Sequence, residues 1–86
     1  AEAWNKRATA HFMMGNFDLS MQDISQTLQL EPRHFGALDG MSLIFIHTNQ
    51  YEKAIQIYDK MLEIFPYSIG TQLKKEKMLS LSNKST

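Results

Sequence analysis

The sequence aligns with itself when it is shifted by 34 residues, and this internal repeat constrains the fold more than any other feature. The alignment needs no gap. The paired positions are Trp4 with Leu38, Ala8 with Ser42, His11 with Phe45, Gly15 with Asn49, Phe17 with Tyr51, Ser20 with Ala54, Ile24 with Tyr58, Leu28 with Leu62 and Pro32 with Pro66. We therefore divide most of the chain into two consecutive copies, residues 1–34 and 35–68.

Each copy predicts two helices joined by a tight turn. Leu38, Ser42 and Phe45 show the helical spacing of apolar and small residues. Gly15 and Asn49 stand where the first helix of each copy should end, and these residue types tolerate the left-handed conformation that closes a helix. We expect helices at roughly 2–14, 18–30, 36–48, 52–64 and 69–81, the last one a capping helix. Residues 82–86 are expected to fray, and the whole of 1–86 forms one all-α domain.

The balance of charge and the lack of cysteine exclude several classes of function. Nine basic and nine acidic residues give zero net charge, so there is no positive field to hold nucleic acid. The absence of cysteine excludes a disulfide framework, a thiolate metal site and a thiol nucleophile. The longest apolar run, Leu43 to Ile46, is far too short to span a bilayer.

No catalytic or metal-binding pattern is present in the sequence. None of His11, His34 and His47 has a second metal ligand four residues away. His11 is expected in the core of the first hairpin and His34 in the turn between the copies. Because phosphate-loop and nucleophile motifs are also missing, we predict no enzyme activity, no cofactor and no metal.

The repeated pattern resembles the tetratricopeptide repeat, which combines large, small and aromatic residues with a proline near its end. The second copy carries this pattern in Ser42, Phe45, Tyr51, Ala54, Tyr58 and Pro66. The first copy has Trp4, Ala8, Phe17, Ser20 and Pro32 in place but departs from the pattern at His11 and Ile24. The resemblance covers residues 1–68 and implies antiparallel helix hairpins, five helices in all, stacked as a short right-handed superhelix.

A finer likeness concerns residues 30–38 together with 4–9 upstream. These stretches resemble short tetratricopeptide-repeat proteins of alphaproteobacteria, which often carry an export signal ahead of their repeats. The likeness implies a bacterial source and an upstream portion outside this chain. It leaves the location open between periplasm and cytoplasm.

The family resemblance implies a protein-binding module without catalytic activity, with a peptide or partner protein held on the concave face of the stack. The residues that we expect on this face are Asn5, Thr9, Phe12, Met13, Asp39, Leu43, Ile46 and His47. Asn5 could bond to a peptide backbone, while the apolar members would form a floor for a ligand side chain. These apolar residues could instead pack in the core. Core packing is the better explanation for Leu43, whereas core packing and ligand contact explain Phe12 and Met13 equally well.

Family members that grip chaperone carboxylates use Lys and Asn at two positions of the repeat. Those positions hold Asn5 and Thr9 in the first copy and Asp39 and Leu43 in the second. The resemblance therefore does not extend to that carboxylate clamp, and Asp39 would repel an acidic tail.

A second hypothesis is structural self-association through the exposed edge of the first helix. The edge residues are Ala3, Arg7, Ala10 and Met14. They occupy the face that would meet a preceding hairpin, and a stacked hairpin cannot bury such a face alone. We expect either an upstream repeat or a second chain to cover this edge.

Overall fold

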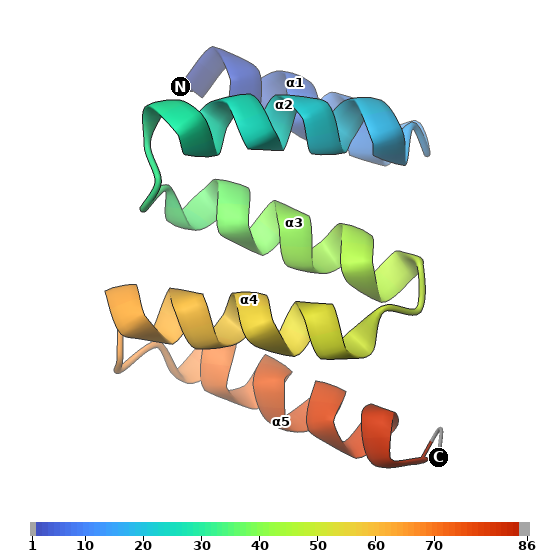
Figure 1. Ribbon diagram of the computed structural model, residues 1–86, viewed down its shortest axis with the longest axis vertical. Helices are drawn as coiled ribbons and strands as arrows, with labels where there is room; N and C mark the ends of the chain where they lie inside the picture. Colours follow the sequence, from blue (N-terminus) through green and yellow to red (C-terminus); the bar gives the residue numbers. More distant parts are fainter. Residues whose placement is uncertain (1, 85–86) are drawn as a thin grey trace.

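The computed structural model describes residues 2–84, except for the side chains of Glu2, Trp4, Asn83 and Lys84. Within this range the chain forms five helices and no strand (Figure 1). They are α1 (Glu2–Met13), α2 (Phe17–Leu30), α3 (Phe35–His47), α4 (Tyr51–Ile64) and α5 (Ile69–Lys84). The predicted all-α fold with five helices is confirmed.

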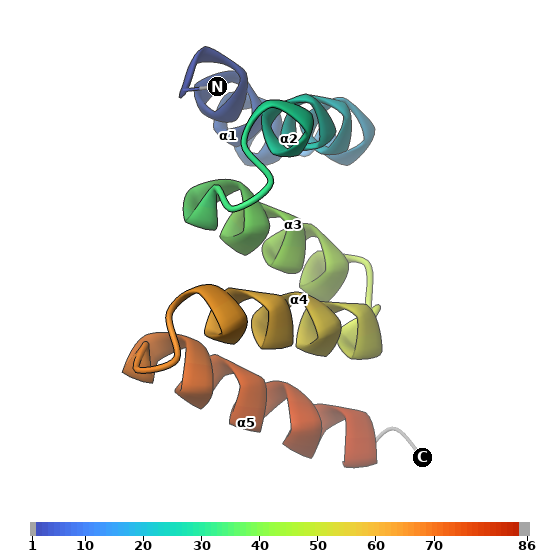
Figure 2. The ribbon, with the colours of Figure 1, turned by 60° about the vertical axis from the view of Figure 1, so that its left-hand side comes forward.

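The helices stack in chain order as two antiparallel hairpins and a final helix. Helices α1 and α2 form the first hairpin, α3 and α4 form the second, and α5 packs on α4. Both helices of the first hairpin contact α3, which joins the two hairpins into one stack. A view turned by 60° shows the same succession, with the described ends of the chain at opposite ends of the stack (Figure 2). This arrangement is that of a helical-repeat solenoid.

The two hairpin turns have the same geometry, as the repeat predicts. Gly15 and Asn49 both adopt the left-handed conformation, with φ of 79° and 61°. The amide of Asn16 donates to the carbonyl of His11 at 2.8 Å, and 34 residues later the amide of Gln50 donates to the carbonyl of Phe45 at 2.7 Å. Such bonds satisfy carbonyls that a helix end leaves without a partner.

Small residues let the helices of each hairpin approach closely. The hydroxyl of Ser20 on α2 donates to the carbonyl of Ala8 on α1 at 2.7 Å, and both residues are buried. In the second hairpin Ser42 and Ala54 are completely buried. The predicted role of these small residues follows from this contact, because a larger side chain would push the helices apart.

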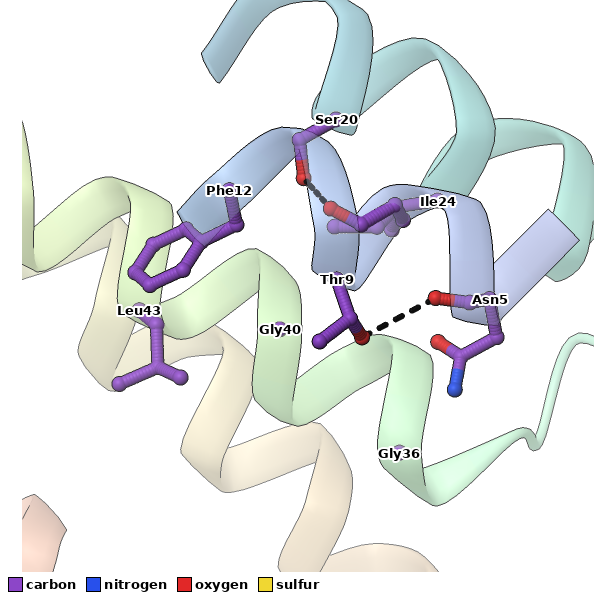
Figure 3. A pocket seen from close by; sticks show the side chains of 9 residues that line it. Asn5, Thr9, Phe12, Ser20, Ile24, Gly36, Gly40 and Leu43 are labelled. Atoms are coloured by element: carbon purple, nitrogen blue, oxygen red, sulfur yellow. Dashed lines mark hydrogen bonds between the residues drawn. The ribbon is translucent and has the colours of Figure 1, made fainter. Parts of the chain in front are cut away.

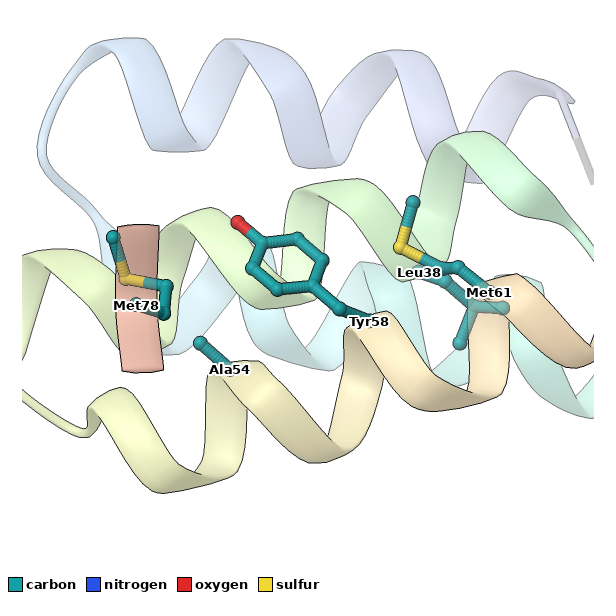
Figure 4. Packing of buried hydrophobic residues seen from close by; sticks show 5 residues of the cluster. All are labelled: Leu38, Ala54, Tyr58, Met61 and Met78. Atoms are coloured by element: carbon teal, nitrogen blue, oxygen red, sulfur yellow. The ribbon is translucent and has the colours of Figure 1, made fainter. Parts of the chain in front are cut away.

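The buried hydrophobic residues form two clusters. The first contains Ala8, Ile24, Ala37 and Ile44 and joins the two hairpins. The second contains Leu38, Ala54, Tyr58, Met61 and Met78 and joins the second hairpin to α5 (Figure 4). Trp4, which the repeat pattern predicts as a core residue, lies outside the described side chains.

Helix α5 extends further than the sequence suggests. It continues to Lys84 rather than ending near 81, so residues 82–84 of the predicted tail are helical; residues 85 and 86 lie outside the described range. Its buried residues Thr71 and Met78 align, after a shift of 34, with the buried residues Ala37 and Ile44 of α3. Helix α5 therefore packs on α4 through the face that α3 turns towards α2.

Candidate functional site

A small cleft lies between α1 and α3, which we call the α1–α3 cleft (Figure 3). Its volume is ≈ 70 Å³. It is lined by Asn5, Ala8, Thr9 and Phe12 of α1, Ser20 and Ile24 of α2, and Gly36, Gly40 and Leu43 of α3. The two repeats thus share one cavity to which each contributes side chains or backbone.

Glycine keeps the α3 wall of the cleft open. A Cβ atom added at Gly40 would lie 3.4 Å from Cδ1 of Ile24. One added at Gly36 would lie 3.5 Å from the side-chain nitrogen of Asn5 and 3.2 Å from Cε1 of His34. Because α3 presents bare backbone at both positions, space remains between it and α1.

The polar groups of the cleft differ in how far they are already bonded. The Thr9 hydroxyl donates to the carbonyl of Asn5 at 3.1 Å, within its own helix. The side-chain amide of Asn5 makes no hydrogen bond to any residue that the structure describes. An amide in this state offers both a donor and an acceptor to a bound molecule.

An aromatic cluster borders the cleft at the C-terminal end of α3. The ring of Phe12 packs edge-on against His47, with centroids 5.1 Å apart. Phe17, the first residue of α2, lies 5.5 Å from Phe12 and 5.7 Å from His47. His47 therefore packs against the turn of the first hairpin and does not line the cleft.

The remaining residues expected on the concave face lie elsewhere. Ile46 is half-buried and packs against the second core cluster. Asp39 pairs with Lys74 of α5, with Oδ1 and Nζ 3.2 Å apart. Met13 is exposed at the end of α1. Of the eight expected residues, the cleft brings together Asn5, Thr9, Phe12 and Leu43.

The predicted edge of α1 contains an ion pair that the sequence interpretation missed. The Nε and Nη2 atoms of Arg7 donate to Oδ2 and Oδ1 of Asp23 on α2, at 2.9 and 2.8 Å. The Asp23 side chain is 4% exposed, whereas that of Arg7 is 58% exposed. The hydrogen bonds from Arg7 lower the pKa of the Asp23 carboxyl and raise that of the guanidinium. The other edge residues, Ala3, Ala10 and Met14, are exposed.

His11 lies next to this pair. Its Nε2 atom is 3.6 Å from Oδ2 of Asp23, and its buried Nδ1 atom has no hydrogen-bond partner in the described part of the chain. The alignment of the two copies contains a sign of the Arg7–Asp23 ion pair, because Met41 and Ile57 of the second copy stand at the positions of Arg7 and Asp23 in the first. Two apolar residues in one copy and two opposite charges in the other indicate a contact across the hairpin.

The described residues provide neither a metal-binding group nor a membrane-spanning helix. Among the described residues, no group of three His, Asp or Glu side chains is placed to hold a metal ion. None of the helices between residues 2 and 84 has the length and apolar character needed to cross a bilayer.

Comparison with known proteins places the second copy in a family. Residues 36–68 match the family model described as the tetratricopeptide repeat. The chain is also similar to a tetratricopeptide repeat-containing protein of the alphaproteobacterium Rhizobium etli, with 46% identity over 66 residues. The match covers 77% of this chain and 32% of the relative, so the chain spans about a third of that relative's length.

These findings confirm the predicted resemblance to the tetratricopeptide-repeat family and the finer likeness to its alphaproteobacterial members. Tetratricopeptide repeats generally mediate contacts between proteins, and the proteins that contain them are generally scaffolds without catalytic activity. Residues 36–68 form a tetratricopeptide repeat, and the chain as a whole has the stacked-hairpin fold of the tetratricopeptide-repeat family.

Proposed function

We propose that this chain is a non-catalytic interaction module that binds an extended peptide segment of a partner protein, and that the α1–α3 cleft receives one side chain of that segment. The observation that carries the proposal is the convergence of Asn5, Thr9 and Leu43, together with Phe12, on one cleft from two successive repeats. These residues were expected on the concave face, where stacked repeats of this kind present their binding surface.

The chemistry of the cleft favours a small aliphatic side chain. Phe12, Ile24 and Leu43 supply an apolar lining. A volume of ≈ 70 Å³ has room for several groups the size of a water molecule, which suits a branched aliphatic side chain better than a large aromatic one. The amide of Asn5 can then bond to the backbone of the same peptide, which fixes its direction across the cleft.

The charges beside the cleft limit the partner further. Asp39 directly precedes Gly40, which lines the cleft, and its carboxylate forms an ion pair with Lys74 of α5. A peptide that carries a carboxylate there would compete with Asp39 for Lys74 and would be repelled by Asp39 itself. A neutral or basic segment fits this surface better than an acidic tail.

Selection from a random peptide library displayed on phage tests the proposal. The selected peptide is titrated against the chain, against Thr9→Arg and against Ala10→Arg. Both residues are exposed on α1, but only Thr9 lines the cleft. We expect Thr9→Arg to weaken binding at least about tenfold, the effect of 1.4 kcal/mol, and Ala10→Arg to leave it within about twofold. A library that yields no binder, or binders insensitive to Thr9→Arg, contradicts the proposal.

The alternative function, self-association through the α1 edge, has less support. Arg7 is committed to Asp23, and the exposed residues Ala3 and Ala10 are small. An interface over this edge would have to remove a charged guanidinium from water, which is unfavourable. Its test is Met14→Glu, which would lower the molecular mass in solution if this edge held two chains together.

A further inference from the structure

The turn between α4 and α5 exposes a group of apolar side chains outside the α1–α3 cleft. We call it the aromatic patch: Phe35, Phe65, Pro66 and Tyr67 line one hollow, and the exposed Ile69 follows two residues after Tyr67 at the start of α5. Phe65 is 56% exposed, Tyr67 92% and Ile69 70%. The ring of Phe65 packs edge-on against Phe35 of α3, with centroids 5.2 Å apart. Large exposed apolar groups gathered in this way mark interaction surfaces more often than lone exposed residues do.

The first repeat shows that these aromatic residues are not needed to form the turn. After a shift of 34, Phe65 aligns with Glu31 and Tyr67 with Arg33. Both turns have the same backbone at the helix end, with φ and ψ of −136° and 87° at Glu31 and of −129° and 87° at Phe65. Both turns also contain the same backbone hydrogen bond. The amide of Glu31 donates to the carbonyl of Thr27 at 2.8 Å, and the amide of Phe65 donates to the carbonyl of Met61 at 2.9 Å.

The first turn therefore forms with the charged residues Glu31 and Arg33 at the positions that Phe65 and Tyr67 occupy in the second turn. Both turns lie at the same end of their hairpins (Figure 1). Since the backbone conformation and hydrogen bond are the same in both turns, the turn does not require aromatic side chains. We infer that those of the second turn have a role outside the turn itself.

The size of the patch fits weak pairing of two copies. If an aromatic side chain offers on the order of 200 Å², the exposed parts of Phe65, Tyr67 and Ile69 together present roughly 400 Å². Two such patches would bury roughly 800 Å² in total, which is below the roughly 1,000 Å² of a stable interface and suits a weak, transient dimer.

The charges next to the patch fit a second copy better than a partner of one sign. A second hollow is lined by Pro32, Arg33, Lys60, Glu63 and Ile64, and Ile64 directly precedes Phe65 in the chain, so charges of both signs lie close to the patch. Under a two-fold axis each surface meets itself, which lets basic groups of one copy face acidic groups of the other. The net charge of zero adds no repulsion between copies.

We propose that two copies of this chain associate through their aromatic patches as a weak two-fold dimer. The interface is separate from the α1–α3 cleft, so each dimer would present two clefts. This inference stands on the contrast between the two turns and does not depend on what the cleft binds.

Sedimentation equilibrium over a series of concentrations tests the dimer. The mass should rise from 9.9 kDa towards twice that value as the concentration increases. The double variant Phe65→Glu and Tyr67→Arg copies the first turn and should remain monomeric. The control variant Met13→Glu and Leu30→Arg places the same charges on exposed apolar positions outside the patch and should dimerise like the wild type.

A single variant separates association from folding. Tyr67→Arg changes a side chain that is almost fully exposed, so it should leave thermal stability unchanged while raising the dissociation constant at least about tenfold. In the wild type, the amide resonances of Tyr67 and Ile69 should shift with concentration and that of Met13 should not. The inference is wrong if the wild-type chain stays monomeric or if the dimer persists in Tyr67→Arg. It is also wrong if the control variant, Met13→Glu with Leu30→Arg, dissociates as much as the variant of the patch.

Discussion

Replacing Gly40 by alanine should separate two properties that meet in the α1–α3 cleft: the stability of α3 and the space for a ligand. Gly40 lies in the interior of α3, where glycine costs roughly 0.5–1 kcal/mol relative to alanine. The added Cβ would lie 3.4 Å from Cδ1 of Ile24, an ordinary van der Waals distance, so the core need not move. We expect Gly40→Ala to raise the melting temperature by roughly 2–8 °C.

The same methyl group takes space from the cleft. It enters a cavity of ≈ 70 Å³ from the α3 wall. A ligand side chain that gives up one buried CH₂ loses about 0.8 kcal/mol, so affinity for the selected peptide should fall about fourfold or more. Stability would be measured by thermal unfolding followed by circular dichroism, and affinity by fluorescence anisotropy with the labelled peptide.

Gly70→Ala is the matched control. Gly70 lies near the start of α5, and a Cβ atom there would have no neighbour within 4 Å. This variant should keep or slightly raise stability and leave affinity unchanged. If Gly40→Ala lowers the melting temperature, α3 and α2 pack more tightly than the 3.4 Å distance to Ile24 indicates. If it raises the melting temperature without weakening binding, the ligand side chain does not enter the cleft.

Three further predictions concern the hairpins and are measured by denaturant unfolding. Ala54→Leu should destabilise the chain by roughly 1–3 kcal/mol, because Ala54 is completely buried between helices; unchanged stability would show that the second hairpin can open. Ser20→Ala should cost about 1 kcal/mol through loss of the bond to the Ala8 carbonyl, and a neutral result would make that bond unimportant. Arg7 lowers the pKa of the Asp23 carboxyl in the folded chain. The ionised carboxylate therefore stabilises the fold above the unfolded carboxyl pKa, and this stabilisation is lost as the pH falls through the lower folded pKa. Arg7→Met should reduce this acid-dependent loss, and an unaltered pH profile would contradict the assignment.

The hairpins were predictable because their geometry follows from local chemistry. Gly15 and Asn49 adopt the left-handed conformation that their residue types favour. Ser20 and Ala54 are buried where the repeat requires small residues. Helix ends were less predictable: α5 continues past 81 because nothing in Leu81, Ser82 or Asn83 stops a helix.

The site was predictable only in part, since the sequence gives the face of a helix but not what another helix places opposite. The spacing of Asn5, Thr9 and Phe12 put them on one face of α1, and the structure adds the open wall made by Gly36 and Gly40. The pairing of Asp39 with Lys74 joins residues 35 positions apart on different helices, which no helical period encodes. Aligning the two copies at every position, and not only at those of the family pattern, would have revealed the Arg7–Asp23 pair.

The most direct test of the central claim is to titrate a selected peptide into the isotopically labelled chain and follow the backbone amide resonances by NMR. If the α1–α3 cleft is the binding site, the largest shifts will fall on Asn5, Thr9, Gly40 and Leu43, with little change at Tyr67 or along the Ala3, Arg7, Ala10 and Met14 edge. If the largest shifts fall on that edge or on the aromatic patch, and the amides of the cleft stay in place, the claim is wrong.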